Sequence, residues 1–260
     1  MEAGKAGQSN TNNYFMKKLL LTFLMPAMII MYVSGQKSYN EHIYNAFING
    51  RMDLWEYNMN KMEEEYLKDR NIQKLYDLTY ALYGFIAYCI VTDDKDKARY
   101  YLNEAGKNVN ILLKYHSSKA EIYSLKGAMY GFEIGLNPLK ALDYGIKSIK
   151  NINKAVELDK NNAKVLMEFG NMKYYTPKIL GGGLSKAIYY HEKAVRMFES
   201  NEHELEGNWL YLLVLTNLGR WYSEDNKENK AKNIYEKILV IEPDYQWVKN
   251  YLYPHLSKTR

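Results

Sequence analysis

Histidine and cysteine, the residues best suited to metal binding or acid–base catalysis, are few and widely separated in this chain. There are five histidines and one cysteine among 260 residues. No two histidines have the helical spacing that forms a zinc site together with a carboxylate, and His203, between two glutamates, comes nearest. Cys89 lies in the apolar run LYGFIAYCIV, so we expect a buried thiol and no disulfide. No Ser/His/Asp or Cys/His set is recognisable either, so we predict no metal, no cofactor and no enzymatic activity.

A glycine-rich segment, YYTPKILGGG over residues 174–183, is the other candidate for chemistry. Glycines before a helix can present backbone N–H groups to an anion, and a helix N-terminus favours negative charge. The segment is not a P-loop, because no Gly-Lys-Ser/Thr follows the glycines and no strand precedes them. The alternative is a structural turn, in which glycine permits positive φ and close helix packing. If the loop is functional, its candidate residues are Tyr175, Lys178, Gly181, Gly182 and Gly183.

The elements that would position such residues are predicted by a repeat over residues 212–245. Eight residues there have the spacing of a tetratricopeptide (TPR) motif, which is a helical hairpin. One amphipathic hairpin cannot bury its apolar face alone, whereas stacked hairpins bury it on each other. The sequence therefore predicts an all-α fold, an α-solenoid of antiparallel helical hairpins. The motif residues are Leu215, Leu218, Gly219, Tyr222, Ala231, Tyr235, Ile238 and Pro243.

Turn signals divide the rest of the chain into further hairpins, and no segment has the pattern of a strand. Gly127 and Ala155 are farther apart than one repeat allows, which indicates a long second helix or a turn inserted near Gly145. The expected hairpins cover residues 41–69, 72–115, 118–162, 163–200 and 208–256, within one solenoid over 36–260.

The chain from Met16 has the pattern of a secretory signal peptide. Two lysines precede an apolar run from Leu19 to Val33, and small residues stand at the cleavage positions near Gly35. We therefore expect a signal peptide over 16–35 and a periplasmic or secreted protein. The alternative is an uncleaved N-terminal anchor. Residues 1–15 are expected to be disordered or an upstream extension.

Charge and composition narrow the class of partner. The formal net charge is +5, and lysines and glutamates are interspersed rather than grouped, so we predict no nucleic-acid partner. The chain has 26 tyrosines, whose rings pack in apolar seams while their hydroxyl groups stay hydrated. Most of them are expected to fill the core, and a minority to line a groove.

Residues 120–198 resemble a family of exported TPR proteins common in Bacteroidetes. The resemblance rests on KALDYGIKSIKNINKAVELDKNNAKV and GNMKYYTPKILGGGLSKAIYYHEKAV, although Lys160 stands where that family usually has proline. It implies an α-solenoid in the bacterial envelope and no known reaction. The chain is also distantly similar to the periplasmic TPR component associated with TRAP transporters, through its glycine-rich turn.

The first helix of each hairpin lines the concave face in TPR arrays, which gives a candidate groove. Aromatic side chains with scattered cations and amides suit a peptide or an extended segment of an envelope protein. The two-carboxylate clamp of chaperone-binding TPR domains is not met, because Met167 stands where lysine is expected. The second hypothesis is a carrier for a small apolar ligand or organic acid. Membrane contact is expected only through an uncleaved signal segment. The groove residues are Tyr80, Tyr83, Lys164, Met167, Asn171, Tyr174, Thr216 and Arg220.

Overall fold

The computed structural model describes residues 39–201 and 205–256. The chain divides into two compact units, residues 1–41 and 42–260, and the helices described below belong to the second unit. The expected extension over 1–15 and signal peptide over 16–35 lie outside the described residues. Over the described part of the chain, none of the helices combines the length and apolarity that crossing a bilayer requires.

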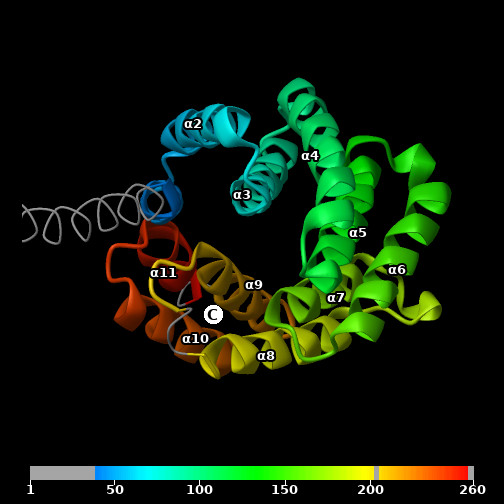
Figure 1. Ribbon diagram of the computed structural model, residues 1–260. Helices are drawn as coiled ribbons and strands as arrows, with labels where there is room; N and C mark the ends of the chain where they lie inside the picture. Colours follow the sequence, from blue (N-terminus) through cyan, green and yellow to red (C-terminus); the bar gives the residue numbers. More distant parts are fainter. Residues whose placement is uncertain (1–38, 202–204, 257–260) are drawn as a thin grey trace, which may run out of the picture. The chain divides into compact units, whose positions relative to one another are not determined.

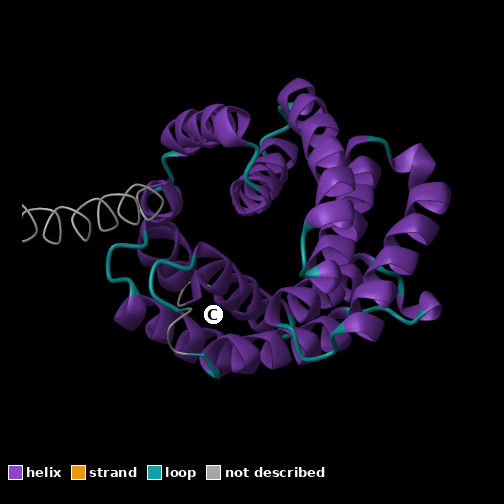
Figure 2. Cartoon of the chain, viewed as in Figure 1, coloured by secondary structure: helices purple, strands orange, loops and turns teal. Residues whose placement is uncertain are grey.

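Every regular element in the described ranges is helical, so the all-α prediction is confirmed (Figure 2). Residues 42–48 are helical and precede α2. A π-helical segment, η4 (Val248–Leu252), and two short 3-10 turns, η1 (Pro138–Lys140) and η2 (Lys178–Leu180), complete the set. The α-helices are α2 (Met52–Asp69), α3 (Ile72–Val91), α4 (Lys95–Tyr115), α5 (Lys119–Leu136), α6 (Ala141–Leu158), α7 (Ala163–Tyr175), α8 (Leu184–Glu199), α9 (Trp209–Glu224), α10 (Glu228–Ile241) and α11 (Tyr253–Leu256).

Consecutive helices pack in pairs. Helix α3 pairs with α4, α5 with α6, α7 with α8, and α9 with α10, and each second helix also contacts the first helix of the next pair. In Figure 1, α3, α7 and α9 lie on the inner side of the array, whereas α6, α8 and α10 lie outside them. Helix α5 contacts both α3 and α7, so we group these four first helices together and call their side of the array the inner face.

The start of several helices is fixed by polar side chains that accept hydrogen bonds from the first helical turn. Asn71 accepts from two backbone N–H groups at the start of α3, and Asn162 does the same for α7. Asp94 caps α4, and Asn208 caps α9. These bonds satisfy N–H groups that have no partner within the helix.

Close approach of the two helices in a hairpin depends on glycine. A Cβ built on Gly219 of α9 would lie 2.4 Å from Cε1 of Tyr235, a buried residue of α10. A Cβ built on Gly170 of α7 would likewise lie 2.3 Å from Nδ1 of His191 in α8. A glycine in the first helix and a ring in the second thus recur as the contact that sets the helix separation.

Residues 42–48 and α2, at the start of the unit, contact α9 and the residues after α10 through aromatic side chains. The rings of Trp55 and Trp209 have centroids 4.9 Å apart, and Phe47 contacts Trp209 and Tyr245 at 5.8 and 5.1 Å. The Tyr44 hydroxyl donates to the Glu242 carboxylate at 2.9 Å. The two ends of this unit are therefore in direct contact.

Replacing Gly219 with alanine tests the glycine contact. The added methyl group must displace the buried Tyr235 ring, so we expect a loss of about 1–3 kcal/mol in the free energy of unfolding. Gly106 in α4 is the matched control, because its Cβ would meet nothing within 4 Å. Gly106→Ala should leave stability unchanged or raise it by up to about 1 kcal/mol through helix propensity. Urea unfolding followed by circular dichroism measures both, and equal effects would refute the contact.

Candidate binding site on the inner helices

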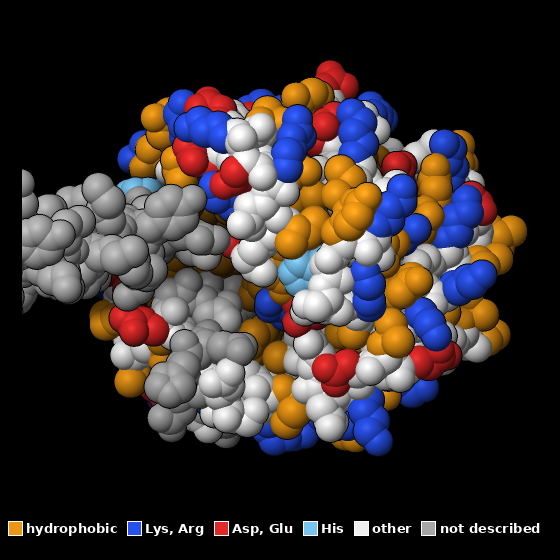
Figure 3. Space-filling view, in the orientation of Figure 1, with side chains coloured by type: hydrophobic (Ala, Val, Ile, Leu, Met, Phe, Trp, Pro, Cys, Tyr) orange, Lys and Arg blue, Asp and Glu red, His pale blue; other side chains and the backbone are white. Residues whose placement is uncertain are grey.

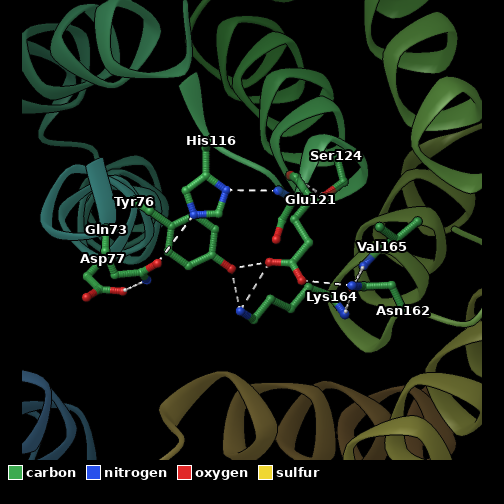
Figure 4. A network of polar contacts seen from close by, with 10 residues as sticks. Gln73, Tyr76, Asp77, His116, Glu121, Ser124, Asn162, Lys164 and Val165 are labelled. Atoms are coloured by element: carbon green, nitrogen blue, oxygen red, sulfur yellow. Dashed lines mark hydrogen bonds and ion pairs between the residues drawn. The ribbon is translucent and has the colours of Figure 1, made fainter. Parts of the chain in front are cut away.

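Lys164 lies at the centre of a polar network that joins α3, α5 and α7 (Figure 4). Its ammonium group is 3.2 Å from the Glu121 carboxylate and donates to the Tyr76 hydroxyl at 2.6 Å. It also lies 5.0 and 4.8 Å from the ring centroids of Tyr76 and Tyr80. One cation therefore holds a carboxylate and two aromatic rings from the two neighbouring inner helices.

Glu121 uses both carboxylate oxygens in this network. Tyr76 donates its hydroxyl hydrogen to Oε2, and Asn162 donates to Oε1 at 2.7 Å. Burial of Glu121 acts to raise its pKa, but the charge of Lys164 and the hydrogen bonds from Tyr76, Asn162 and Lys164 outweigh it and lower the pKa. The carboxylate is therefore held in its ionised form.

His116 extends the network at the turn between α4 and α5. Its ring stacks on Tyr76 with centroids 4.5 Å apart and an interplanar angle of 6°. Nδ1 accepts from the Ser118 backbone N–H at 3.1 Å, which leaves Nε2 to donate to the Gln73 side-chain oxygen at 3.4 Å. Burial lowers the pKa of His116, so the ring is neutral at pH 7.

Glu168 is a buried acid one helical turn beyond Lys164. Its side chain is fully enclosed, and its Oε1 has no hydrogen-bond partner among the described residues. Burial raises the pKa of Glu168 to about 7, although hydrogen bonds from Tyr83 and Asn171 act in the opposite direction. Near neutral pH the proton on this carboxyl group is therefore easily gained or lost.

The structure separates the predicted groove residues into two groups. Tyr80, Tyr83, Met167 and Thr216 are buried, and Thr216 donates its hydroxyl hydrogen to its own helix at Leu212. These four side chains form the wall behind the inner face and offer no surface to a partner in this arrangement.

The other four predicted groove residues reach solvent. Lys164, Asn171 and Tyr174 are half-buried along one side of α7, and Arg220 is exposed on α9. Tyr174 stacks on Trp221 at 4.8 Å and donates to Glu224 at 2.8 Å.

Arg220 adds a cation next to this row. Its guanidinium lies 5.6 Å from the ring centroid of the half-exposed Trp247. The accessible surface is thus a row of amide, hydroxyl and cationic groups in front of an aromatic wall.

The backbone N–H groups of the glycine-rich segment are already used. Gly181 donates to Lys178, Gly182 to Pro177, and Gly183 to Lys173 at 2.7 Å. Gly181 and Gly183 have φ of 85° and 111°, and a Cβ on Gly182 would lie 1.9 Å from the Thr176 carbonyl oxygen. These bonds support the interpretation as a structural turn, because the three N–H groups point to carbonyl oxygens rather than to an anion.

Two surface clefts are lined mainly by polar residues. One, of ≈ 260 Å³, lies where α4 meets the end of α5 and is lined by Arg99, Leu102, Asn103, Glu133, Leu136, Asn137 and Lys140. The other, of ≈ 510 Å³, is lined by His42, Asn45, Ala46, Asn49, Arg51, Leu54, Asn58 and Gln246. Neither has the apolar lining that is typical of a site for a small apolar ligand.

Comparison with known proteins identifies the fold. No protein-family model and no curated protein matches the chain. The structure is similar to a thermophilic TPR protein of Thermus thermophilus, with a TM-score of 0.52 and 14% identity over 80% of this chain and 93% of that one. It is also similar to the HusA haemophore from Porphyromonas gingivalis, with a TM-score of 0.50 and 18% identity over 66% of this chain and 90% of that one.

The fold is a TPR-like helical solenoid. This confirms the class predicted from the repeat at 212–245, whose residues Leu215, Gly219, Ala231 and Ile238 lie in the buried seam of the α9–α10 hairpin.

Sequence reasoning did not find Glu121, Glu168 or His116 as members of the site. Tyr76, Tyr80 and Tyr83 have the spacing of one helical face, and Lys164 and Glu168 are one turn apart, so part of the signal was present. Pairing Glu121 with Lys164 requires the relative position of α5 and α7, which single-repeat spacing does not give.

Replacing Lys164 with methionine should expose the cost of leaving Glu121 unpaired. The carboxylate would lose its counter-charge while remaining 12% exposed, so we expect a loss of about 3 kcal/mol at pH 8. The loss should shrink at pH 5, because the pKa of an unpaired Glu121 rises and the group takes up a proton. Lys147→Met removes an exposed pair with Asp143 and should cost less than about 1 kcal/mol. A Lys164→Met variant as stable as this control would contradict the network's role.

Glu168→Gln tests the buried acid through the pH dependence of stability. The pKa is about 7 in the folded chain against an ordinary 4.5, so the folded state binds more protons between these values. The contribution of Glu168 to the free energy of unfolding is then fully present below pH 4.5. It is lost as pH rises through 7, a change of about 3 kcal/mol. Glu168→Gln should remove this decline and be the more stable form at pH 8, whereas Glu157→Gln, on the exposed side of α6, should not. Urea unfolding at pH 5 and pH 8 measures the difference, and an unchanged pH slope would overturn the assignment.

Proposed function

We propose that this protein is an exported, non-catalytic binding protein that holds an extended segment of an envelope protein against its inner face. The observation that carries the proposal is the row of Lys164, Asn171 and Tyr174 along one side of α7, with Arg220 beside it on α9. These groups can bond to the backbone and to acidic side chains of a peptide, while the aromatic residues behind them keep the row in place.

Two further observations support this proposal. The TPR-like fold favours a protein partner in general, and the solved TPR protein from Thermus thermophilus shares that fold. The apolar run from Leu19 to Val33 favours export, with cleavage near Gly35, as in the Bacteroidetes family that the sequence resembles.

Four residues of the predicted groove are buried, and this limits what the partner can be. Tyr80 and Tyr83 are each 5% exposed, so these two rings offer no pocket to a bulky anchor. A narrow, extended segment suits this row better than an amphipathic helix, which needs a wide apolar groove. Its backbone carbonyl groups can accept hydrogen bonds from Lys164 and Asn171, and its carboxylates can pair with Arg220.

A second candidate is a carrier for a small apolar ligand, favoured by the similarity to a protein described as a haemophore. Haemin is the direct probe. A Soret shift that saturates at one equivalent and is lost in Arg220→Ala with Tyr174→Ala would favour this candidate. Equal spectra with and without protein would leave the peptide-binding proposal in place.

Photo-crosslinking tests the proposed function at single positions. A photoreactive residue in place of Asn171 should form adducts with a defined envelope protein in cells of the source organism. The control places the same photoreactive residue at position 232 instead of Lys232, which is exposed on the outer helix α10, and this variant should form no such adduct. Tyr174→Ala combined with Arg220→Ala should reduce the adduct while helicity is retained. Identical adducts from both positions, or no dependence on Tyr174 and Arg220, would refute binding at the inner face.

A further inference from the structure

The turns within hairpins lie along one edge of the unit, and this edge carries its most exposed apolar side chains. The two helices of a hairpin run antiparallel, so the α3–α4, α5–α6 and α7–α8 turns are on the same side. A Cβ built on Gly135 near the end of α5 would lie 3.4 Å from Ile90 near the end of α3. Tyr174 at the end of α7 bonds to Glu224 at the end of α9. We call this side the turn edge.

Exposure distinguishes the turn edge from the rest of the surface. Among the described residues, six large apolar side chains are 82–96% exposed, and five of them lie at the turn edge, whereas Val240 lies on α10. Single exposed apolar residues are normal on a protein surface, but a concentration at one edge indicates an interaction site. The five are Val91 (85%), Leu139 (96%), Leu142 (82%), Tyr175 (82%) and Ile179 (92%).

The backbone holds these side chains outward. Leu139 lies in η1, which Pro138 begins, and Ile179 lies in η2. The η2 turn is fixed by the three glycine N–H bonds described above and by the contact of Gly182 with Thr176. The apolar tips are therefore presented by ordered turns rather than by long loops.

Charge indicates what could cover this edge. Lys140 is adjacent to Leu139, and Lys178 is adjacent to Ile179. At the α3–α4 turn the charges are mixed, because Asp93 pairs with Lys95 at 3.0 Å and Asp96 with Arg99 at 3.6 Å. The nearest acid on α6, Asp143, is paired with Lys147 at 2.7 Å. In Figure 3, the side chains over α5 and α6 are mainly cationic or apolar, with fewer acidic ones. The exposed aliphatic side chains of the α5–α6 and α7–α8 turns, which have lysines next to them, suit insertion among acyl chains beside anionic headgroups.

The smaller cleft lies at the same edge and could seat a headgroup. Its lining includes Arg99 and Lys140 with the amides of Asn103 and Asn137, although Glu133 also lines it. Lys140, the residue after Leu139, and the two amides can donate hydrogen bonds to an anionic group, whereas Arg99 is also paired with Asp96 at 3.6 Å.

From these observations we propose that the turn edge seats the protein on an anionic lipid bilayer. This is independent of the proposed peptide-binding function, and it differs from membrane attachment through the N-terminal run. The inner face and the turn edge use different side chains, so a membrane-bound protein keeps its inner face available.

Site-specific fluorescence tests the proposal in the full chain. Cys89, the one cysteine, is buried, so a cysteine introduced at position 179 can be labelled selectively with the environment-sensitive dye NBD. The comparison is Ile179→Cys against Val240→Cys, which is similarly exposed on α10. Vesicles of phosphatidylcholine with phosphatidylglycerol should shift the emission at 179 to the blue and leave it unchanged at 240. Pure phosphatidylcholine, or Lys140→Glu with Lys178→Glu, should give a smaller shift.

Other outcomes would overturn the proposal. No shift at 179, or equal shifts at 179 and 240, would mean that the N-terminal run or nonspecific adsorption accounts for any binding. A blue shift at 179 that grows with protein concentration in the absence of vesicles would mean that the edge pairs with a second copy of the chain. Because the readout is local, attachment of the chain through residues 19–33 cannot produce the predicted difference.

Discussion

A half-buried ammonium group that lies against two aromatic rings is stabilised by a carboxylate beside it, because desolvating an unpaired charge is costly. Lys164 meets this requirement by reaching from α7 to Glu121 on α5 and to Tyr76 and Tyr80 on α3. Neighbouring hairpins in a solenoid are otherwise joined mainly by nonpolar contacts, which tolerate small shifts. This ion pair has a specific geometry, and it therefore fixes three inner helices in one register.

The rest of the inner face follows from that register. With α3 and α7 linked, Tyr83 and Glu168 are enclosed between them, and the acid carries a pKa of about 7. The aromatic contact of Trp55 with Trp209 joins α2 to α9. What stays accessible is a narrow polar row, which is why the proposed partner is an extended segment. The exposed apolar side chains are found elsewhere, on the edge formed by the turns.

The fold was predictable because its signals are local. The spacing of Leu215, Gly219 and Ala231 specifies a hairpin without reference to any other part of the chain. The site was only partly predictable, since it depends on contacts between residues as far apart as Tyr76 and Lys164. Counting in register placed Tyr80 and Met167 on a groove, yet both are buried, and side chains of α3 and α7 contact each other in front of them. The separation of Gly127 and Ala155 led us to expect a long second helix or an inserted turn near Gly145. Instead α6 has 18 residues, fewer than the 21 of α4, and Gly145 lies inside it without a turn.

Hydrogen exchange measured by mass spectrometry on the native chain and on Lys164→Met tests the central claim most directly. If the Lys164 network holds α3, α5 and α7 together, amide protection should fall in all three helices of the variant, while α9 and α10 keep theirs. A loss of protection confined to the first turns of α7, with α3 and α5 unchanged, would contradict the account.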